Sequence, residues 1–178
     1  MIRRSMVTVF LLLMAVSIGN GAELTLQNAP TQVYFSPHGG CTEAIVDALN
    51  HAKIEVLVQA YSFTSKEIAK ALIDAHKRGV HVEIILDKSN RNKNGRYSAA
   101  DFTAHANVLT YIDSEHPISH NKIIVLDESV VISGSFNFSR NAENNAENLM
   151  IIKDAQLAKL YKHNWLMHKK HSEVYHGK

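Results

Sequence analysis

Two kinds of hydrophobic pattern alternate along the first two thirds of the chain. Short, nearly continuous apolar runs rich in valine and isoleucine predict buried strands, and the segments between them repeat apolar residues every three to four positions, as amphipathic helices do. The predicted strands are residues 32–36, 54–60, 80–86 and 108–112, and the predicted helices are residues 42–52, 65–78 and 97–105. Such alternation with short connections is typical of an α/β fold. We therefore expect a mixed, largely parallel β-sheet flanked by helices on both faces.

The last third of the chain changes this rhythm. Two apolar runs, residues 123–126 and 130–132, are separated only by a three-residue polar turn that begins at Asp127, which predicts two tightly connected strands. A strand over residues 147–152 and a helix over residues 154–170 complete the pattern. Ligands of open α/β sheets bind at the carboxyl ends of the strands, so polar residues next to strand ends are the candidates for a site.

Residues 1–22 have the pattern of a secretory signal sequence. Arg3 and Arg4 give a positive start, an apolar segment follows, and small residues up to Ala22 suit cleavage. The apolar segment is short for a membrane span, and an uncleaved N-terminal anchor is the alternative. We expect one mature domain, residues 23–178, that is exported to the periplasm or secreted and has no stable membrane insertion once the signal is removed.

The charge of the mature chain is balanced. The full sequence has 19 lysines and arginines and 17 aspartates and glutamates, and removal of Arg3 and Arg4 leaves 17 of each. A uniformly basic coat for nucleic acid is therefore absent, and a polyanion would have to bind at a local patch. Cys41 is the only cysteine, which excludes an intramolecular disulfide and a cysteine-based zinc cluster. We expect its thiol to be buried or half-buried, with pairing to another chain as the alternative.

The polar residues within residues 120–137 form the candidate active site. His120 and Lys122 are two positions apart, so on a strand they point to the same side and place a nucleophile or acid–base group beside a cation. Gly134 and Ser135 follow the second strand of the pair, where a backbone without a side chain allows a phosphate to approach closely. The alternative is a plain β-hairpin with polar ends.

The spacing of these residues resembles the HKD motif of the phospholipase D superfamily. The resemblance holds at every fixed position, which are His120, Lys122, Asp127, Gly134, Ser135 and Asn137. The segments after Gly134 and around Glu147 are similar to those of the small, exported bacterial endonucleases of this superfamily. The resemblance covers roughly residues 23–170 and implies a phospholipase D-like fold. Members use two motifs per active site and this chain has one, which implies a homodimer with its active site on the two-fold axis.

The resemblance also implies a role for each side chain. His120 of one chain attacks phosphorus and forms a phosphohistidine, and His120 of the partner protonates the leaving oxygen. Lys122, Ser135 and Asn137 bind the phosphoryl oxygens of the substrate. Glu147 is similar to the family's later glutamate, which holds the histidine ring in orientation.

Neither a metal nor a cofactor is expected, because the resemblance implies that lysines take the place of a metal. Several histidines lie near the C-terminus, but a frayed tail offers no fixed scaffold for converging ligands. They are His163, His168, His171 and His176. Asp127 belongs to the catalytic set by its place in the motif, and a structural role in bracing the turn is the alternative.

Residues 88–96 form a basic segment after a predicted strand. Its cations are Lys88, Arg91, Lys93 and Arg96, and it contains no acidic residue. A solvated surface loop and a loop that contacts the phosphates of DNA both explain this composition.

The sequence thus predicts a metal-independent phosphodiesterase, and specifically an endonuclease that hydrolyses DNA, or RNA, with little sequence preference. A phospholipase D or cardiolipin-type lipid hydrolase is the first alternative, and the basic segment argues against it. A non-catalytic DNA-binding module is the second, and the intact His120 and Lys122 argue against that.

Overall fold

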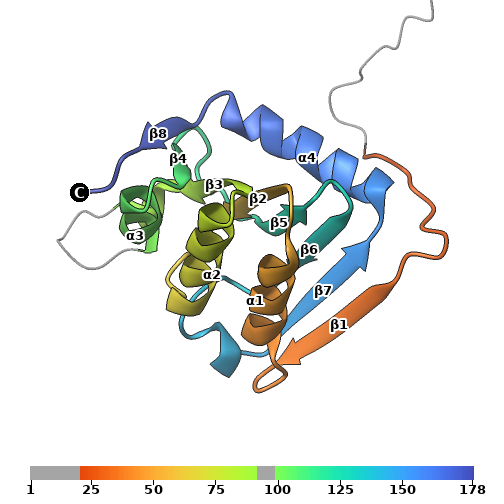
Figure 1. Ribbon diagram of the computed structural model, residues 1–178. Coiled ribbons are helices and arrows are strands. Elements are labelled where there is room, and N and C mark those ends of the chain that lie inside the picture. The colour runs from red at the N-terminus through yellow and green to blue at the C-terminus, as the bar shows by residue number, and fades with distance from the viewer. Residues whose placement is uncertain (1–20, 92–98) are drawn as a thin grey trace, which may run out of the picture.

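The computed structural model describes residues 21–91 and 99–178 of the chain (Figure 1). Its elements, in chain order, are β1 (Thr31–Ser36), α1 (Cys41–His51), β2 (Glu55–Ala60), α2 (Lys66–Lys77), β3 (His81–Asp87), the 3₁₀ helix η1 (Lys88–Asn90), α3 (Ala99–His105), β4 (Leu109–Asp113), β5 (Lys122–Leu126), β6 (Val130–Gly134), the 3₁₀ helix η2 (Ala142–Asn144), β7 (Glu147–Lys153), α4 (Ala155–Lys169) and β8 (Glu173–Tyr175). The predicted strands and helices are present, with ends that differ by a few residues, and β8 is an additional element.

The eight strands form one mixed sheet in the order β1-β7-β6-β5-β2-β3-β4-β8. The pairs β2–β3 and β3–β4 are parallel, as crossover connections through α2 and α3 require. All other neighbours are antiparallel. A mixed sheet is confirmed, but the prediction that it is largely parallel is wrong. The tight turn after β5 reverses the chain into β6, and β7 and β1 continue the antiparallel pairing.

Helices cover both faces of the sheet, as predicted. In Figure 1, α1 and α2 lie side by side on one face and α4 runs across the other. The larger core lies under α1, α2 and α3 and contains alternate residues of the strands, such as Ile124 and Ile132. The smaller core lies under α4, where the buried Trp165 donates its indole N–H to the carbonyl of Val58 at 2.8 Å. The central strands are therefore buried on both faces, which explains their continuous apolar runs.

The helix starts are stabilised in two different ways. Ser65 accepts a hydrogen bond from the backbone N–H of Ile68 at the start of α2. The capping residue of α1 is Gly40, which has a left-handed conformation and no side chain to accept a hydrogen bond. The backbone N–H of Thr42 donates instead to the carboxylate of Glu143, 2.6 Å away, which ties α1 to η2.

The C-terminal segment is folded onto the sheet, so the expectation of a frayed tail is wrong. After α4 the chain turns back, and β8 pairs antiparallel with β4. Lys162 and Lys169 form ion pairs with Glu55 and Glu83 of the sheet at 2.7 and 2.5 Å. The side chain of Leu160, on the same helix, is exposed. Acidic residues on the strands thus decide which lysines of α4 face the sheet.

Cys41 is fully buried at the start of α1, as expected. Burial, together with the neighbouring Glu143 and Glu43, raises the pKa of its thiol to about 11. The thiolate is the reactive form of cysteine, so Cys41 is a core residue rather than a nucleophile.

The predicted signal sequence lies almost entirely outside the described residues, which begin at Gly21. None of the helices within the described ranges is both long and apolar enough to cross a membrane.

Candidate active site

The predicted site residues gather at one edge of the sheet. Lys122 opens β5, Glu147 opens β7 and Gly134 ends β6. The carboxyl end of β2 lies at the same edge, because the backbone N–H of Tyr61 donates to the carbonyl of Asn121 at 2.9 Å. This is the edge at which the parallel strands end, where the sequence pattern predicted a site.

His120 and Lys122 face the same space, as their spacing predicted. The ammonium of Lys122 donates to the carbonyl of His120 at 2.8 Å and lies 3.2 and 3.3 Å from the Nδ1 and Nε2 atoms of its ring. The His120 side chain is exposed, whereas Lys122 is only 7% exposed. A fixed cation therefore stands beside an accessible imidazole, an arrangement suited to attack on an anionic phosphate.

Glu147 acts on Lys122 through its charge. Burial lowers the pKa of Lys122, and the nearby Glu147 carboxylate opposes this by raising it. The Oε1 atom of Glu147 also accepts a hydrogen bond from the side-chain amide of Asn145 at 3.4 Å. Among the described residues, the structure thus connects Glu147 electrostatically to the lysine of the pair; its orientation of a histidine ring stays a prediction.

The Glu147→Gln variant is expected to lose activity at a lower pH than the wild type. Glutamine removes the negative charge that raises the pKa of Lys122, so the ammonium deprotonates at lower pH and the alkaline limb of kcat/KM moves in the same direction. A profile of kcat/KM against pH measures this. The Glu128→Gln control, at the far turn of the β5–β6 hairpin, should leave the limb in place. An unmoved limb in Glu147→Gln would contradict the electrostatic role.

Tyr61 is a site residue that the sequence reading missed. Its ring packs against that of His120 with centroids 4.5 Å apart and an interplanar angle of 53°, and the Lys122 ammonium lies 5.4 Å from its centroid. The contact holds the imidazole on one side while the other side stays accessible. The available signal was that Tyr61 follows a strand buried on both faces and so stands at the predicted edge.

Gly134 and Ser135 are shaped mainly by their contact with β7. A Cβ atom on Gly134 would lie 2.2 Å from the carbonyl oxygen of Asn148, so glycine is needed for close packing of the two strands rather than for phosphate. The same oxygen accepts the backbone N–H of Ser135 at 3.1 Å, which removes that group from the candidate donors. The Ser135 hydroxyl accepts from the backbone N–H of Asn148 at 3.0 Å, and its own hydrogen stays available for a phosphate.

Asn137 has a polar atom that the folded chain leaves unpaired. Within the described residues, its Oδ1 atom is buried and has no hydrogen-bond partner. Buried polar atoms are normally paired, so an unpaired one next to a candidate site is a place for a ligand or water. An acceptor such as Oδ1 calls for a donor, so the predicted role of Asn137, donation of its amide N–H to phosphoryl oxygens, stays a prediction.

Asp127 lies at the opposite end of β5 from His120. Its carboxylate accepts hydrogen bonds from the backbone N–H groups of Lys53, Ile54 and Glu55 at 2.8–3.0 Å. Its own N–H donates to the carbonyl of Glu55 at 2.9 Å. Asp127 is therefore not part of the candidate active site, because it lies beyond the opposite end of strand β5 from His120 and Lys122. The structural alternative accounts for its place in the motif: it fixes the start of β2 against the hairpin turn.

The basic segment is described only in part, since Lys93 and Arg96 fall within residues 92–98, outside the described ranges. Lys88 donates to the carbonyl of His116 at 3.0 Å, and Arg91 forms an ion pair with Glu173. Asn90, between them, donates to the carbonyl of Tyr61 at 2.6 Å. The start of the segment is thus attached to the residue that packs against His120.

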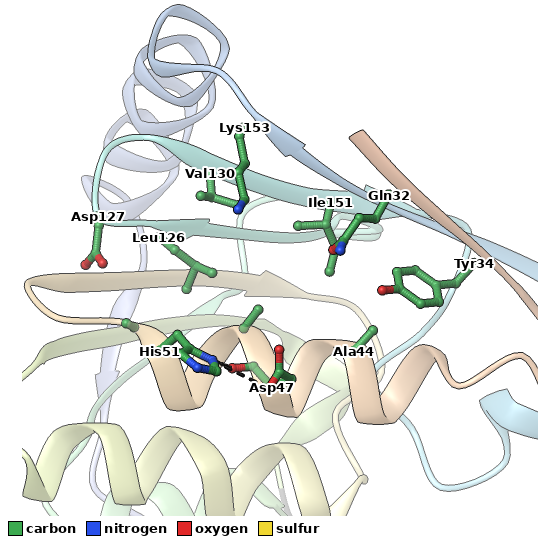
Figure 2. A pocket seen from close by; sticks show the side chains of 12 residues that line it. Gln32, Tyr34, Ala44, Asp47, His51, Leu126, Asp127, Val130, Ile151 and Lys153 are labelled. Atoms are coloured by element: carbon green, nitrogen blue, oxygen red, sulfur yellow. Dashed lines mark hydrogen bonds and ion pairs between the residues drawn. The ribbon is translucent and has the colours of Figure 1, made fainter. Parts of the chain in front are cut away.

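A pocket of about 390 Å³ lies elsewhere, between α1 and the strands β1, β5, β6 and β7 (Figure 2). Its lining includes Ala44 and His51 of α1 on one side and Tyr34, Leu126 and Lys153 of the sheet on the other. Asp127 is the only motif residue that lines it, at the hairpin end of the sheet. The pocket is therefore separate from the candidate active site.

Comparison with known proteins identifies the family. Residues 45–168 match the phospholipase D-like domain of cardiolipin synthase. The phospholipase D of Rickettsia bellii is 40% identical over 145 residues, which are 81% of this chain and 71% of the relative. The human mitochondrial cardiolipin hydrolase is 28% identical over 127 residues, 70% of this chain and 50% of the relative.

The fold agrees with solved structures. Nuc from Salmonella typhimurium, a phospholipase D family member, matches with a TM-score of 0.77 and 36% identity over 83% of this chain and 98% of its own. NucT from Helicobacter pylori matches with a TM-score of 0.74 over 83% and 99%, at an identity of 22% that supports the fold alone.

Fold and relatives together define a phosphodiesterase, and its candidate site contains a histidine beside a lysine. The chain belongs to the phospholipase D superfamily. The family predicted from the motif is confirmed, and assignment to its small exported endonucleases stays a prediction.

Proposed function

We propose that this chain is a metal-independent endonuclease that hydrolyses DNA with little sequence preference. The phosphodiesterase chemistry follows from the family and the His120–Lys122 pair. The nucleic-acid substrate is supported by one observation above all: the basic segment that begins at Lys88 is tied through Asn90 to Tyr61, beside His120. Cations on a segment beside the site suit a polyanion that extends beyond the scissile phosphate.

The proposed reaction has two displacements at phosphorus. A ring nitrogen of His120 attacks, a P–N bond forms, and the P–O bond to the leaving alcohol breaks as His120 of the partner subunit protonates that oxygen. Water then attacks the phosphohistidine, the P–N bond breaks, and the same partner histidine accepts the proton from water. Lys122 stabilises the negative charge on the phosphoryl oxygens in both steps, and Asn137 supplies a side-chain amide.

The proposed enzyme is a homodimer, because this reaction needs two histidines and the motif occurs once in the sequence. Exposed apolar side chains near the site edge suit a contact with a second copy. Phe35 precedes Ser36, the partner of Glu147 in the sheet, and is 65% exposed. Ile118, two residues before His120, is 60% exposed. Closed two-fold symmetry would bring the two copies of His120 together.

A lipid substrate is the second candidate. It is favoured by the names of the relatives, which include phospholipase D and mitochondrial cardiolipin hydrolase. Export to the periplasm or the medium, proposed from residues 1–22, is compatible with either substrate and with action outside the cytoplasm.

Substrate choice is tested by incubating the purified protein with plasmid DNA, RNA or phosphatidyl lipid vesicles in EDTA. We expect the DNA to be cleaved and the phosphatidyl lipid to be hydrolysed very little. In the Lys88→Ala/Arg91→Ala variant, the slope of log K for DNA binding against log salt concentration should become shallower by about 2, since each lost phosphate contact contributes about 0.9 to that slope. The control Lys159→Ala/Lys170→Ala, on α4 and at its C-terminal cap, should keep the wild-type slope. Lipid hydrolysis with intact DNA would favour the lipid hydrolase, and shifted but uncut DNA would favour a binding module.

A further inference from the structure

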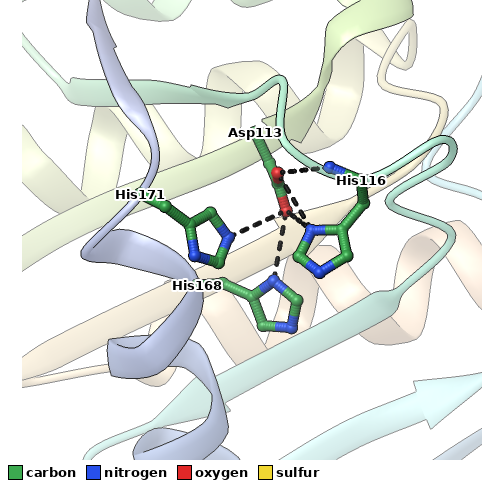
Figure 3. A group of neighbouring side chains, drawn as sticks. All are labelled: Asp113, His116, His168 and His171. Atoms are coloured by element: carbon green, nitrogen blue, oxygen red, sulfur yellow. Dashed lines mark hydrogen bonds and ion pairs between the residues drawn. The ribbon is translucent and has the colours of Figure 1, made fainter.

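Three histidines converge on one buried aspartate beside the C-terminal segment (Figure 3). Asp113 ends β4 and is fully buried, His116 lies in the loop that follows, and His168 and His171 come from the end of α4 and the turn before β8. One ligand atom from each residue lies within 4.8 Å of the others. The folding of the tail onto β4 creates this group, which the expectation of a frayed C-terminus excluded.

The three distances from Asp113 to the histidines are close to those between ligand atoms around a tetrahedral metal ion. The Oδ2 atom of Asp113 lies 3.0 Å from His116 Nδ1, 3.1 Å from His168 Nδ1 and 3.5 Å from His171 Nε2. Zinc–ligand bonds of about 2.0–2.1 Å in a tetrahedron place neighbouring ligand atoms about 3.3 Å apart. A zinc ion at the centre therefore requires the ligand atoms, which lie within 4.8 Å of one another, to close to about 3.3 Å.

The surroundings of the two ring nitrogens of His171 also suit a metal ligand. Its Nε2 atom, which faces Asp113, is buried and has no hydrogen-bond partner among the described residues. Its other ring nitrogen, Nδ1, lies 3.7 Å from the carboxylate of Glu115. Metal-binding histidines commonly donate their second ring N–H to a carboxylate, which directs the lone pair of the first nitrogen to the metal.

We propose that Asp113, His116, His168 and His171 bind one zinc ion in a structural site. Four protein ligands close a tetrahedral shell, as in sites that stabilise a fold rather than catalyse. The ion would fasten α4 and β8 to the loop between Asp113 and His120, and so hold the segment that leads into the active site. The site is separate from the phosphodiesterase chemistry, which uses no metal in the proposed mechanism.

The test measures zinc content and thermal stability of the untagged protein after dialysis against EDTA and addition of ZnCl₂. We expect one zinc per chain by mass spectrometry after gel filtration. Because a ligand that binds only the folded state stabilises it, the Tm should rise by roughly 10 °C at saturating zinc. The His168→Ala/His171→Ala variant should lose the bound zinc and the rise in Tm, and the matched control His163→Ala/His176→Ala should keep both.

A second variant guards against misfolding of the first. His116→Gln changes a side chain that is 41% exposed and should bind zinc at least about tenfold more weakly in a folded protein. Zinc absent from the wild type, or retained equally by His116→Gln, would overturn the site. Cleavage of DNA below the Tm of the zinc-free protein reports separately on the proposed endonuclease, so the two proposals can fail independently.

Discussion

The His120→Ala variant is expected to lose at least about 10⁴-fold in kcat/KM, because in the proposed mechanism the residue is both the nucleophile of its own chain and the acid–base group for its partner. Lys122 and Asn137, the proposed phosphate-binding residues, remain in this variant, so substrate binding should change far less than turnover. Initial rates on plasmid DNA and on a small phosphodiester measure the loss, and a DNA-binding assay in EDTA measures the remaining affinity for DNA.

The matched control for this result is His163→Ala. His163 is an exposed histidine of α4 outside the candidate site, and its removal should leave the rate within about twofold, as for most surface substitutions. Circular dichroism should show that both variants are folded. A rate for His120→Ala close to that of the wild type would refute the assignment of the active site.

The Asp127→Ala variant is expected to unfold roughly 10 °C below the wild type, which corresponds to about 3 kcal/mol for a chain of this size. Three backbone N–H groups at the start of β2 lose their charged acceptor, in a partly exposed setting where water replaces some of the loss. Alanine also has to adopt the left-handed backbone of Asp127, with φ at 49°, which costs about 1 kcal/mol. Thermal unfolding followed by circular dichroism measures the change.

The Asp127→Asn control separates structure from catalysis. Asparagine tolerates the left-handed conformation and keeps one oxygen for Ile54 and Glu55, so its Tm should lie between those of Asp127→Ala and the wild type. Below its Tm, each folded molecule of Asp127→Ala should retain activity within a few-fold of the wild type. A stable Asp127→Ala protein without activity would return Asp127 to the catalytic set.

The site edge was predictable because its signals are local. The two-residue spacing of His120 and Lys122 places both on one side of a strand, and strand ends identify the edge of the sheet. The position of Tyr61 carried the same signal and was overlooked. The role of Asp127 could not be chosen from sequence, because its partners Lys53–Glu55 lie more than 70 residues earlier.

The rest of the fold depends on contacts between distant segments. A segment such as residues 147–152 predicts a strand but not its direction, so the predominance of antiparallel pairs was missed. β8 has three residues without a buried apolar run, and only its pairing with β4 defines it. The same pairing brings His171 to Asp113, so the proposed zinc site was invisible before the fold was known.

The central claim is that one active site is built from two copies of the chain. It is tested most directly by a heterodimer of one wild-type chain and one His120→Ala chain, co-expressed with two different affinity tags and purified through both. A shared site needs both histidines, so the heterodimer should be almost as inactive as the His120→Ala homodimer, with kcat reduced by at least about 10³-fold. Half of the wild-type activity per dimer would show that each chain works alone and would contradict the shared site.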